Sequence, residues 1–583
     1  MMQHPKKPVV WLIWDGAAGW ATRRMLEEGA LPALGSLAAT GVSADALVPS
    51  PNCQTPPSLA TLFTGTWPRQ HGIHGFSVPK VGTESNPLDY RSGFDPDLLG
   101  VDPIWSYLGH KKCSSVLVNI PWVMSPSNGE VPEGVVFATE GYSHRVTRGG
   151  VFEIPPKQIG QNLSYQVGSH LLEISTERNA KVTIKDIITD QQIVLRLNEN
   201  LSSEEKYLMF ENGERFLFKT HFRSHDGALL LLHTGIWRTR TFPSNEQSTF
   251  ENESGPFIGE GLGNAYRRGV FGPRLAEGGN GEAERVLLRT ISWSADYFRR
   301  CSMTAVERHP GADLYMFYQP CIDDIEHELI GWCDPCSKAY RPDIEEQTWA
   351  ILREVYQMAD RHLANLLKHF GNECTVIVSS DHGMAGMTHT IHVNESLAQA
   401  ELLTFNMDHK VDLERTVLFY HPANNGSLWI NPSITDFKTR QDILSKGIAA
   451  LRCITHPEDG TPAFHAIYPI DDELEETGYV PTMGDLFVAA NDGFELSAEQ
   501  SPDGQVIVPT LKSASHATNP NRPSLRGIFY ARGEHIAYGR DLKVVDNRSV
   551  FPLICHQLGV SSPKNIEGVI HPEISNSYVG SKT

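Results

Sequence analysis

The stretch that decides the fold is PVVWLIWDG, at residues 8–16. Its side chains are apolar without interruption from Val9 to Trp14, and a carboxylate, Asp15, follows at once. Two later runs have the same character, DLYMFY at residues 313–318 and CTVIVSS at residues 374–380. Continuous apolar runs of this length, without alternation, are typical of strands buried on both faces of a parallel sheet.

A long helix is predicted directly before the third of these strands. Residues 345–370 carry apolar side chains at helical spacing, and Gly371 follows as a helix-ending residue. A helix followed at once by a buried strand is half of a strand–helix–strand unit. The sequence therefore predicts an α/β fold with a mostly parallel central sheet flanked by helices.

The remaining sequence divides this core with two insertions. Short segments at residues 181–188, 192–197 and 214–220 read as strands separated by turn-forming residues. A second change of composition covers about residues 402–505. After it, the sequence again has the apolar pattern of the α/β core. We predict a catalytic domain in three parts, residues 1–150, 251–400 and 506–583, interrupted by a strand-rich insertion at 151–250 and a cap-like insertion at 401–505.

Composition narrows the possible partners. Of 583 residues 40% are hydrophobic and 20% charged, which indicates an ordinary globular protein, and the net charge of −19 argues against bulk nucleic acid or an anionic membrane as the partner. We see no apolar run of the ~18 residues that a membrane helix requires. The nine cysteines are scattered, so we expect free thiols and a reducing cytoplasm. Nothing in the sequence indicates the oligomeric state.

Potential metal ligands follow all three buried strands. A single aspartate at a strand end often forms a turn or caps a helix. Here, however, such side chains follow each of the three predicted strands. In α/β proteins, ligands bind at the carboxyl ends of the parallel strands. The candidates are Asp15, Asp323, His327, Asp381 and His382.

The number and kind of these side chains favour two cations. Asp323 and His327 are four residues apart, so on a helix they face the same way. Carboxylates and imidazoles without thiolates suit Zn²⁺, or Mn²⁺ as an alternative, and five ligands exceed one tetrahedral site. Two metal ions are the usual arrangement for displacement at phosphorus.

A nucleophile candidate lies at Thr55, in TPPSLATLF. Proline just after it and the helix-forming residues beyond place Thr55 at or near the start of a helix. The threonine hydroxyl then either caps this helix or faces a phosphate bound at its N-terminus. The sequence leaves both interpretations open at this point.

Together these motifs resemble the alkaline phosphatase superfamily, in particular its type I phosphodiesterase/nucleotide pyrophosphatase branch. The resemblance covers residues 8–76, 314–384 and 516–559. It implies an alkaline phosphatase-like fold and a small-molecule phosphate ester as substrate. It also implies that one metal is held by Asp15, Thr55, Asp381 and His382, the other by Asp323, His327 and His516, and that Thr55 attacks phosphorus to give a phosphothreonine intermediate. His516 is a candidate through this resemblance alone.

The substrate pocket is not predicted. In HGIHGF, Phe76 stands where this branch commonly has an asparagine that binds a phosphate oxygen. The resemblance therefore assigns no substrate-binding residue. His389 and His392, close to the third strand, are candidates for orienting a metal ligand.

Related activities are alternatives to phosphodiester or pyrophosphate hydrolysis. A sulfatase needs a Cys-x-Pro-x-Arg segment, which Cys53 does not begin, and a cofactor-independent phosphoglycerate mutase would use serine in place of Thr55. Phosphomonoester hydrolysis and cleavage of a carbon–phosphorus bond in a phosphonate stay open. A non-catalytic binding protein on the same fold is disfavoured because all seven positions are filled.

Overall fold

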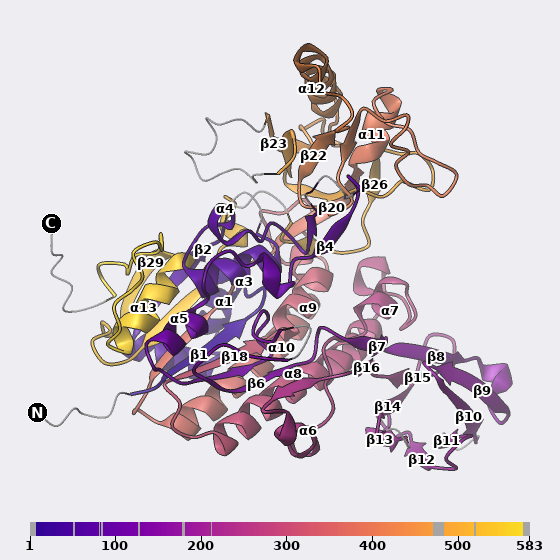
Figure 1. Ribbon diagram of the computed structural model, residues 1–583. Helices are drawn as coiled ribbons and strands as arrows, with labels where there is room; N and C mark the ends of the chain where they lie inside the picture. The colour runs from indigo at the N-terminus through magenta and orange to yellow at the C-terminus, as the bar shows by residue number, and fades with distance from the viewer. Residues whose placement is uncertain are drawn as a thin grey trace, which may run out of the picture.

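A nine-stranded sheet forms the centre of the molecule (Figure 1). The computed structural model describes residues 7–49, 53–80, 82, 86–125, 129–177, 181–210, 213–469, 483–517 and 521–574. The strands of the central sheet, in spatial order, are β17 (Arg240–Phe242), β6 (Val135–Glu140), β5 (Ser115–Val118), β18 (Leu314–Gln319), β1 (Val9–Trp14), β19 (Thr375–Ser379), β28 (Gly527–Arg532), β2 (Val42–Leu47) and β29 (Arg540–Asp546).

The three strands predicted from apolar runs are neighbours at the middle of this sheet. β1 pairs in parallel with β18, Val9 opposite Leu314, and with β19, Val9 opposite Thr375. All residues of these strands are buried, which explains why their sequences are apolar on both faces. Five neighbouring strand pairs of this sheet are parallel, and three, formed by β17 and β28, are antiparallel. The prediction of a mostly parallel sheet is therefore confirmed.

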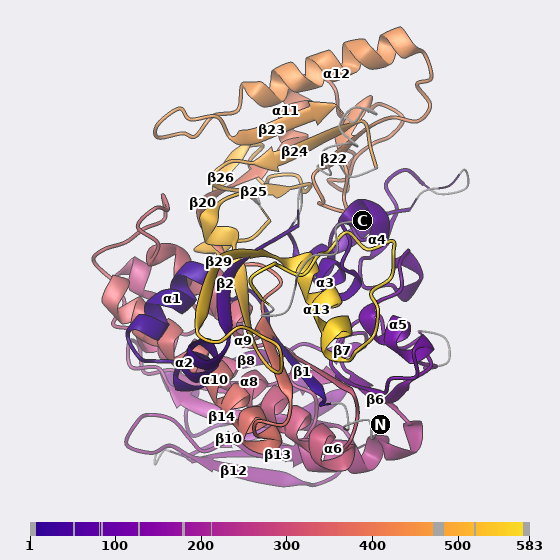
Figure 2. The same ribbon diagram turned by 90° about the vertical axis from the view of Figure 1, so that its left-hand side faces the viewer.

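Helices cover both faces of the sheet (Figure 2). On one face, α10 packs against α8, α9 and α2, and on the other α3 contacts α13. The predicted helix at residues 345–370 is confirmed as α10. The helices of the core are α1 (Gly19–Glu27), α2 (Pro32–Thr40), α3 (Thr55–Thr64), α4 (Pro68–His71), α5 (Ile104–His110), α6 (Gln247–Ser254), α7 (Gly263–Arg267), α8 (Glu282–Arg308), α9 (Cys321–Leu329), α10 (Glu345–Phe370) and α13 (Val550–Gln557).

Between β6 and β17 the chain forms two antiparallel four-stranded sheets with their own buried cluster (Figure 1). Their alternating buried and exposed residues fit sheets with one face toward this cluster. One sheet contains β9 (Asn162–Val167), β10 (His170–Thr176), β11 (Lys181–Asp186) and β12 (Gln192–Arg196). The other contains β8 (Gly150–Ile154), β13 (Lys206–Met209), β14 (Arg215–Phe222) and β15 (Leu229–His233).

A further unit after β19 has a separate hydrophobic cluster. It contains the helices α11 (Val393–Gln399) and α12 (Phe437–Arg452). Its strands are β20 (Ala385–His392), β21 (Leu418–Tyr420), β22 (Ser427–Ile430), β23 (Phe464–Pro469), β24 (Leu486–Ala490), β25 (Gly493–Ser497), β26 (Ile507–Pro509) and β27 (Ala514–Ser515). Two short strand pairs lie outside these sheets: β3 (Ser77–Pro79) with β4 (Tyr90–Ser92), and β7 (Arg145–Thr147) with β16 (Ile236–Trp237).

The helices and the cysteines bear on the predictions about the location of the protein and the chemistry of its thiols. Within the described ranges no helix combines the length and the apolar character needed to cross a bilayer. All nine cysteines lie within the described residues, and none of them forms a disulfide there. That they are ordinary thiols stays a prediction. A cytoplasmic location stays a prediction.

Candidate active site

The carboxyl ends of β1, β18 and β19 meet at one edge of the sheet. Asp15 follows β1, α9 begins after β18, and Asp381 follows β19. The Asp323 N–H donates to the Asp15 carbonyl at 3.1 Å, and the Gly16 N–H donates to Asp381 Oδ1 at 3.2 Å. These bonds hold the three strand ends together, so side chains far apart in the sequence become neighbours.

Asp15, Asp381 and His382 form the first group of converging side chains. One ligand atom from each lies within 4.8 Å of the others. His382 Nε2 is 3.5 Å from Asp15 Oδ1 and 3.3 Å from Asp381 Oδ2. All three residues are buried.

The tautomer of His382 determines what this group can bind. Its Nδ1 lies 3.0 Å from the Gly383 carbonyl, which accepts only, so Nδ1 carries the proton. Burial lowers the pKa of His382 to about 3, so the ring is neutral and Nε2 has a free lone pair. That lone pair faces two buried carboxylates and the Thr55 hydroxyl, and this set of nitrogen and oxygen donors suits a cation.

Asp323, His327 and His516 form the second group, again within 4.8 Å. His327 Nε2 lies 3.5 Å from Asp323 Oδ2, and His516 Nε2 lies 3.9 Å from Asp323 Oδ1. The Nδ1 atoms of the two histidines face the carbonyls of Ala514 and Cys53, at 3.0 and 3.1 Å. Burial holds the pKa of both histidines well below its ordinary value, so their Nε2 lone pairs are also free. The helical placement of Asp323 and His327 on α9 is as predicted.

Unpaired carboxylate oxygens support the fit of cations to both groups. Asp15 Oδ1, Asp323 Oδ1 and Asp381 Oδ2 are buried and have no hydrogen-bond partner in the described part of the chain. Burial, and then the neighbouring carboxylates, raise the pKa of Asp15 and Asp323 well above its ordinary value. A buried, unpaired carboxylate is costly unless a cation compensates it, so the donor set suits Zn²⁺ or Mn²⁺.

The two groups lie side by side. The imidazole rings of His382 and His516 stack with their centroids 3.7 Å apart and an interplanar angle of 9°. Since His382 belongs to the first group and His516 to the second, two cations bound here would be neighbours.

Thr55 lies next to the first group. It is the first residue of α3, and its Oγ1 atom is 3.2 Å from His382 Nε2. Gln54 occupies the cap position of this helix, so the interpretation of Thr55 as the cap is wrong. The hydroxyl instead turns toward the candidate metal ligands, at the helix end where the dipole favours negative charge.

Two residues around the site were not predicted. The Tyr318 hydroxyl donates to Asp15 Oδ2, and the Asn547 side chain donates to the Ser380 and Asp381 carbonyls at 3.2 Å. A polar side chain inside a strand buried on both faces was the available signal for Tyr318. For Asn547 it was its place directly after a strand, β29.

The predicted roles of His389 and His392 are not found. His389 Nδ1 contacts the Thr388 hydroxyl, and His392 Nδ1 faces the Glu499 carbonyl. Main-chain carbonyls orient the three candidate ligand histidines instead.

Gly16 allows β1 and α9 to approach each other, which gives a first prediction. Its φ is +72°, and a Cβ there would lie 2.8 Å from Asp323 Cα. Gly16→Ala is expected to displace Asp323 and to lower the free energy of unfolding by about 3 kcal/mol, from backbone strain and overpacking together. Denaturant titration and metal content after dialysis measure both effects.

Gly29→Ala is the matched control. Gly29 has a φ of +70° with nothing within 4 Å of its Cβ position, so only the backbone strain of about 1 kcal/mol is expected and metal content should not change. Equal losses in the two variants would show that the contact with Asp323 is unimportant.

These features define an α/β protein with two adjacent groups of candidate metal ligands at the carboxyl edge of its sheet. The chain belongs to the type I phosphodiesterase/nucleotide pyrophosphatase family, whose model matches residues 9–226 and 258–519. This match confirms the resemblance predicted from the motifs, and it indicates hydrolase activity on phosphodiester or pyrophosphate bonds.

Solved structures of other proteins are similar to this one at low sequence identity. The chain is similar to human ectonucleotide pyrophosphatase/phosphodiesterase 5, with a TM-score of 0.49 and 13% identity over 98% of this chain and 100% of that one. For the murine protein the TM-score is 0.47 and the identity 12%, over 96% and 97% of the two chains, and the same values hold for its inactive threonine-to-alanine variant in complex with AMP. No curated protein matches.

Proposed function

We propose that this protein hydrolyses a phosphodiester or pyrophosphate bond of a small molecule with the help of two divalent cations, Zn²⁺ or Mn²⁺. The observation that carries the proposal is the convergence of two groups of free lone pairs beside the Thr55 hydroxyl. The residues that would hold the cations are Asp15, Thr55, Asp381 and His382 for one, and Asp323, His327 and His516 for the other. The family assignment supports the same class of reaction.

In this proposal Thr55 is the nucleophile. Its oxygen loses a proton and bonds to phosphorus, while the bond from phosphorus to the departing oxygen breaks and that oxygen takes a proton. The product is a phosphothreonine that keeps the remaining ester group. Water then attacks phosphorus and returns the hydroxyl of Thr55. When bound, the cations would supply charge stabilisation and lower the pKa of oxygens in contact with them.

The chain's own residues prepare this step. The hydrogen bonds from Nδ1 of His327, His382 and His516 to carbonyls fix each ring so that Nε2 points into the site. The hydrogen bond that the Tyr318 hydroxyl donates to Asp15 Oδ2 fixes this carboxylate. Its other oxygen, Oδ1, is left free to bind a cation. Thr55 is 5% exposed, so its hydroxyl is enclosed by the residues of the site.

The unit that follows β19 in the chain borders the proposed nucleophile, Thr55. This position supports the proposal that residues 401–505 form a cap over the site. Gln54, next to Thr55, donates to the Asn424 carbonyl at 3.4 Å. Gln54, Asn425 and Ala517 also line a cavity of 30 Å³ with Phe487. We propose that this unit limits the size of the group on the substrate.

A panel of substrates tests the proposed function. We expect aryl phosphodiesters or nucleoside pyrophosphates to be turned over with kcat/KM at least about tenfold above that of aryl phosphomonoesters and phosphonates. Chelation should remove the activity and Zn²⁺ or Mn²⁺ should restore it. A preference for monoesters or phosphonates would select those alternatives, whereas chelator-resistant turnover by metal-free protein would reject cation dependence.

A further inference from the structure

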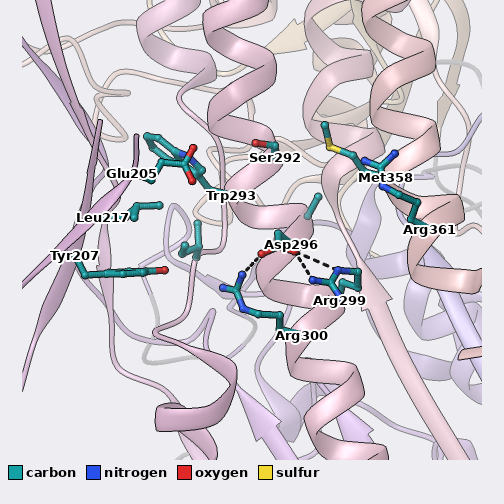
Figure 3. Close-up of a pocket in the computed structure, with 12 residues that line it drawn as sticks. Glu205, Tyr207, Leu217, Ser292, Trp293, Asp296, Arg299, Arg300, Met358 and Arg361 are labelled. Atoms are coloured by element: carbon teal, nitrogen blue, oxygen red, sulfur yellow. Dashed lines mark hydrogen bonds and ion pairs between the residues drawn. The ribbon is translucent and has the colours of Figure 1, made fainter. Parts of the chain in front are cut away.

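A cavity of 410 Å³ lies away from the candidate active site, between the strands β13 and β14 and the helices α8 and α10 (Figure 3). None of the seven predicted site residues is among the described residues that line it. Its volume is within the ~300–1,000 Å³ typical of small-molecule sites. The cavity is thus large enough for a ligand of its own.

Arginines dominate the polar wall of this cavity. Arg299 and Arg300 lie on either side of Asp296, as Figure 3 shows. Arg299 binds Asp296 Oδ1 through Nη2 at 2.6 Å and Nε at 3.2 Å, and Arg300 Nη1 contacts Oδ2. One carboxylate therefore balances only one of two guanidinium groups.

The other charges increase this excess. Arg361, on α10, makes no hydrogen bond or salt bridge with a residue in the described ranges, although it lines the same cavity. Glu205 is already paired with Lys219, at 3.1 Å. Two positive charges are thus left facing one cavity, on a chain whose net charge is −19.

The rest of the wall is aromatic and apolar. Tyr207 extends from β13 toward the arginines in Figure 3, and Leu217 and Met358 add apolar surface. Trp293 also lines the cavity and is 4% exposed. The wall beside the arginines is therefore aromatic and apolar.

We propose that this cavity binds an organic phosphate monoester with an aromatic body. At neutral pH a phosphate monoester carries a charge of about −1.5 to −2, which matches the two positive charges left on the wall. Guanidinium groups bind phosphate oxygens with paired N–H donors, and the ring would pack against Tyr207 and the apolar side chains. This site is independent of the proposed catalytic function.

Calorimetry with phenyl phosphate tests the proposal. The protein is the metal-loaded Thr55→Ala variant, in which no turnover interferes, with inorganic phosphate and phenol as comparison ligands. We expect two binding events for phenyl phosphate, one at the candidate active site and one at the cavity. Arg361→Ala should weaken one event at least about tenfold and leave the other unchanged, because it removes the unpaired guanidinium.

Controls separate the cavity from the catalytic centre. Arg353→Ala removes an arginine from the same helix that pairs with Glu28 outside the cavity, so both binding events should persist. In the protein with Thr55 intact, Arg361→Ala should keep turnover. No binding event weakened by Arg361→Ala, equal binding of phenol at the event that Arg361→Ala weakens, or the same loss in Arg353→Ala would overturn the proposal. A stronger event with inorganic phosphate than with phenyl phosphate would show that no aromatic body is recognised and would also overturn it.

Discussion

Thr55→Ala is expected to lower kcat by at least about 10³-fold while the fold and the bound metals persist. The reason is geometric. Thr55 Oγ1 lies 3.2 Å from His382 Nε2 at the start of α3, whereas the Tyr318 hydroxyl, which also reaches the site, is engaged with Asp15. Steady-state kinetics with an aryl phosphodiester, together with metal analysis, measure the loss.

Thr55→Ser is the matched control for that variant. Serine keeps the hydroxyl and removes only the methyl group, so kcat should stay within about tenfold of the original value. Wild-type turnover in Thr55→Ala would remove Thr55 from the mechanism. Equal inactivity of both variants would indicate that the substitution disturbs α3 rather than the chemistry.

Asp323→Asn is expected to remove one of two bound metals and to lower kcat/KM at least about 100-fold. The amide keeps the size of the side chain but not its charge, and it leaves His327 and His516 as a pair of neutral ligands. Asp381→Asn should have the same effect on the other group. Elemental analysis of the purified variants gives the metal content per chain.

Asp324→Asn is the control for Asp323→Asn. Asp324 is the next residue on α9 and belongs to neither candidate group. Burial, followed by the charge of Glu260, raises the pKa of Asp324 to about 7, so an amide changes its charge less than at an ordinary aspartate. We expect both metals to persist and turnover to stay within about threefold. If Asp323→Asn kept both metals, the second group would not be a metal site.

Local sequence was sufficient to predict three neighbouring strands at the middle of the nine-stranded sheet and most of the candidate site. β1 and β19 could be predicted because strands between two helical layers are apolar on both faces, and α10 because its apolar spacing ends at Gly371. Five of the candidate ligands were predicted because they follow the carboxyl ends of buried strands, and in the structure these five lie close to Thr55 and His516. His516 had no local signal, since it lies in a loop between short strands and reaches the site only through the fold.

The parts that could not be predicted depend on contacts between distant segments. The carbonyls of Ala514 and Cys53 orient histidines far away in sequence, and carbonyls have no sequence signature. The cavity beside Arg361 arises where β13 meets α8 and α10, elements that a sequence pattern places in separate units. Periodicity describes each element alone, whereas such sites depend on how the elements pack.

Trapping of the covalent intermediate tests the central claim most directly. Metal-loaded protein is mixed with an excess of an aryl phosphodiester, quenched in acid within one turnover, and digested for mass spectrometry. We predict that the peptide containing Thr55 gains the mass of the phosphoryl group with its retained ester, and that Thr55→Ala gains none. Full turnover with no modified Thr55 at any quench time, or modification of another residue, would contradict the proposed mechanism.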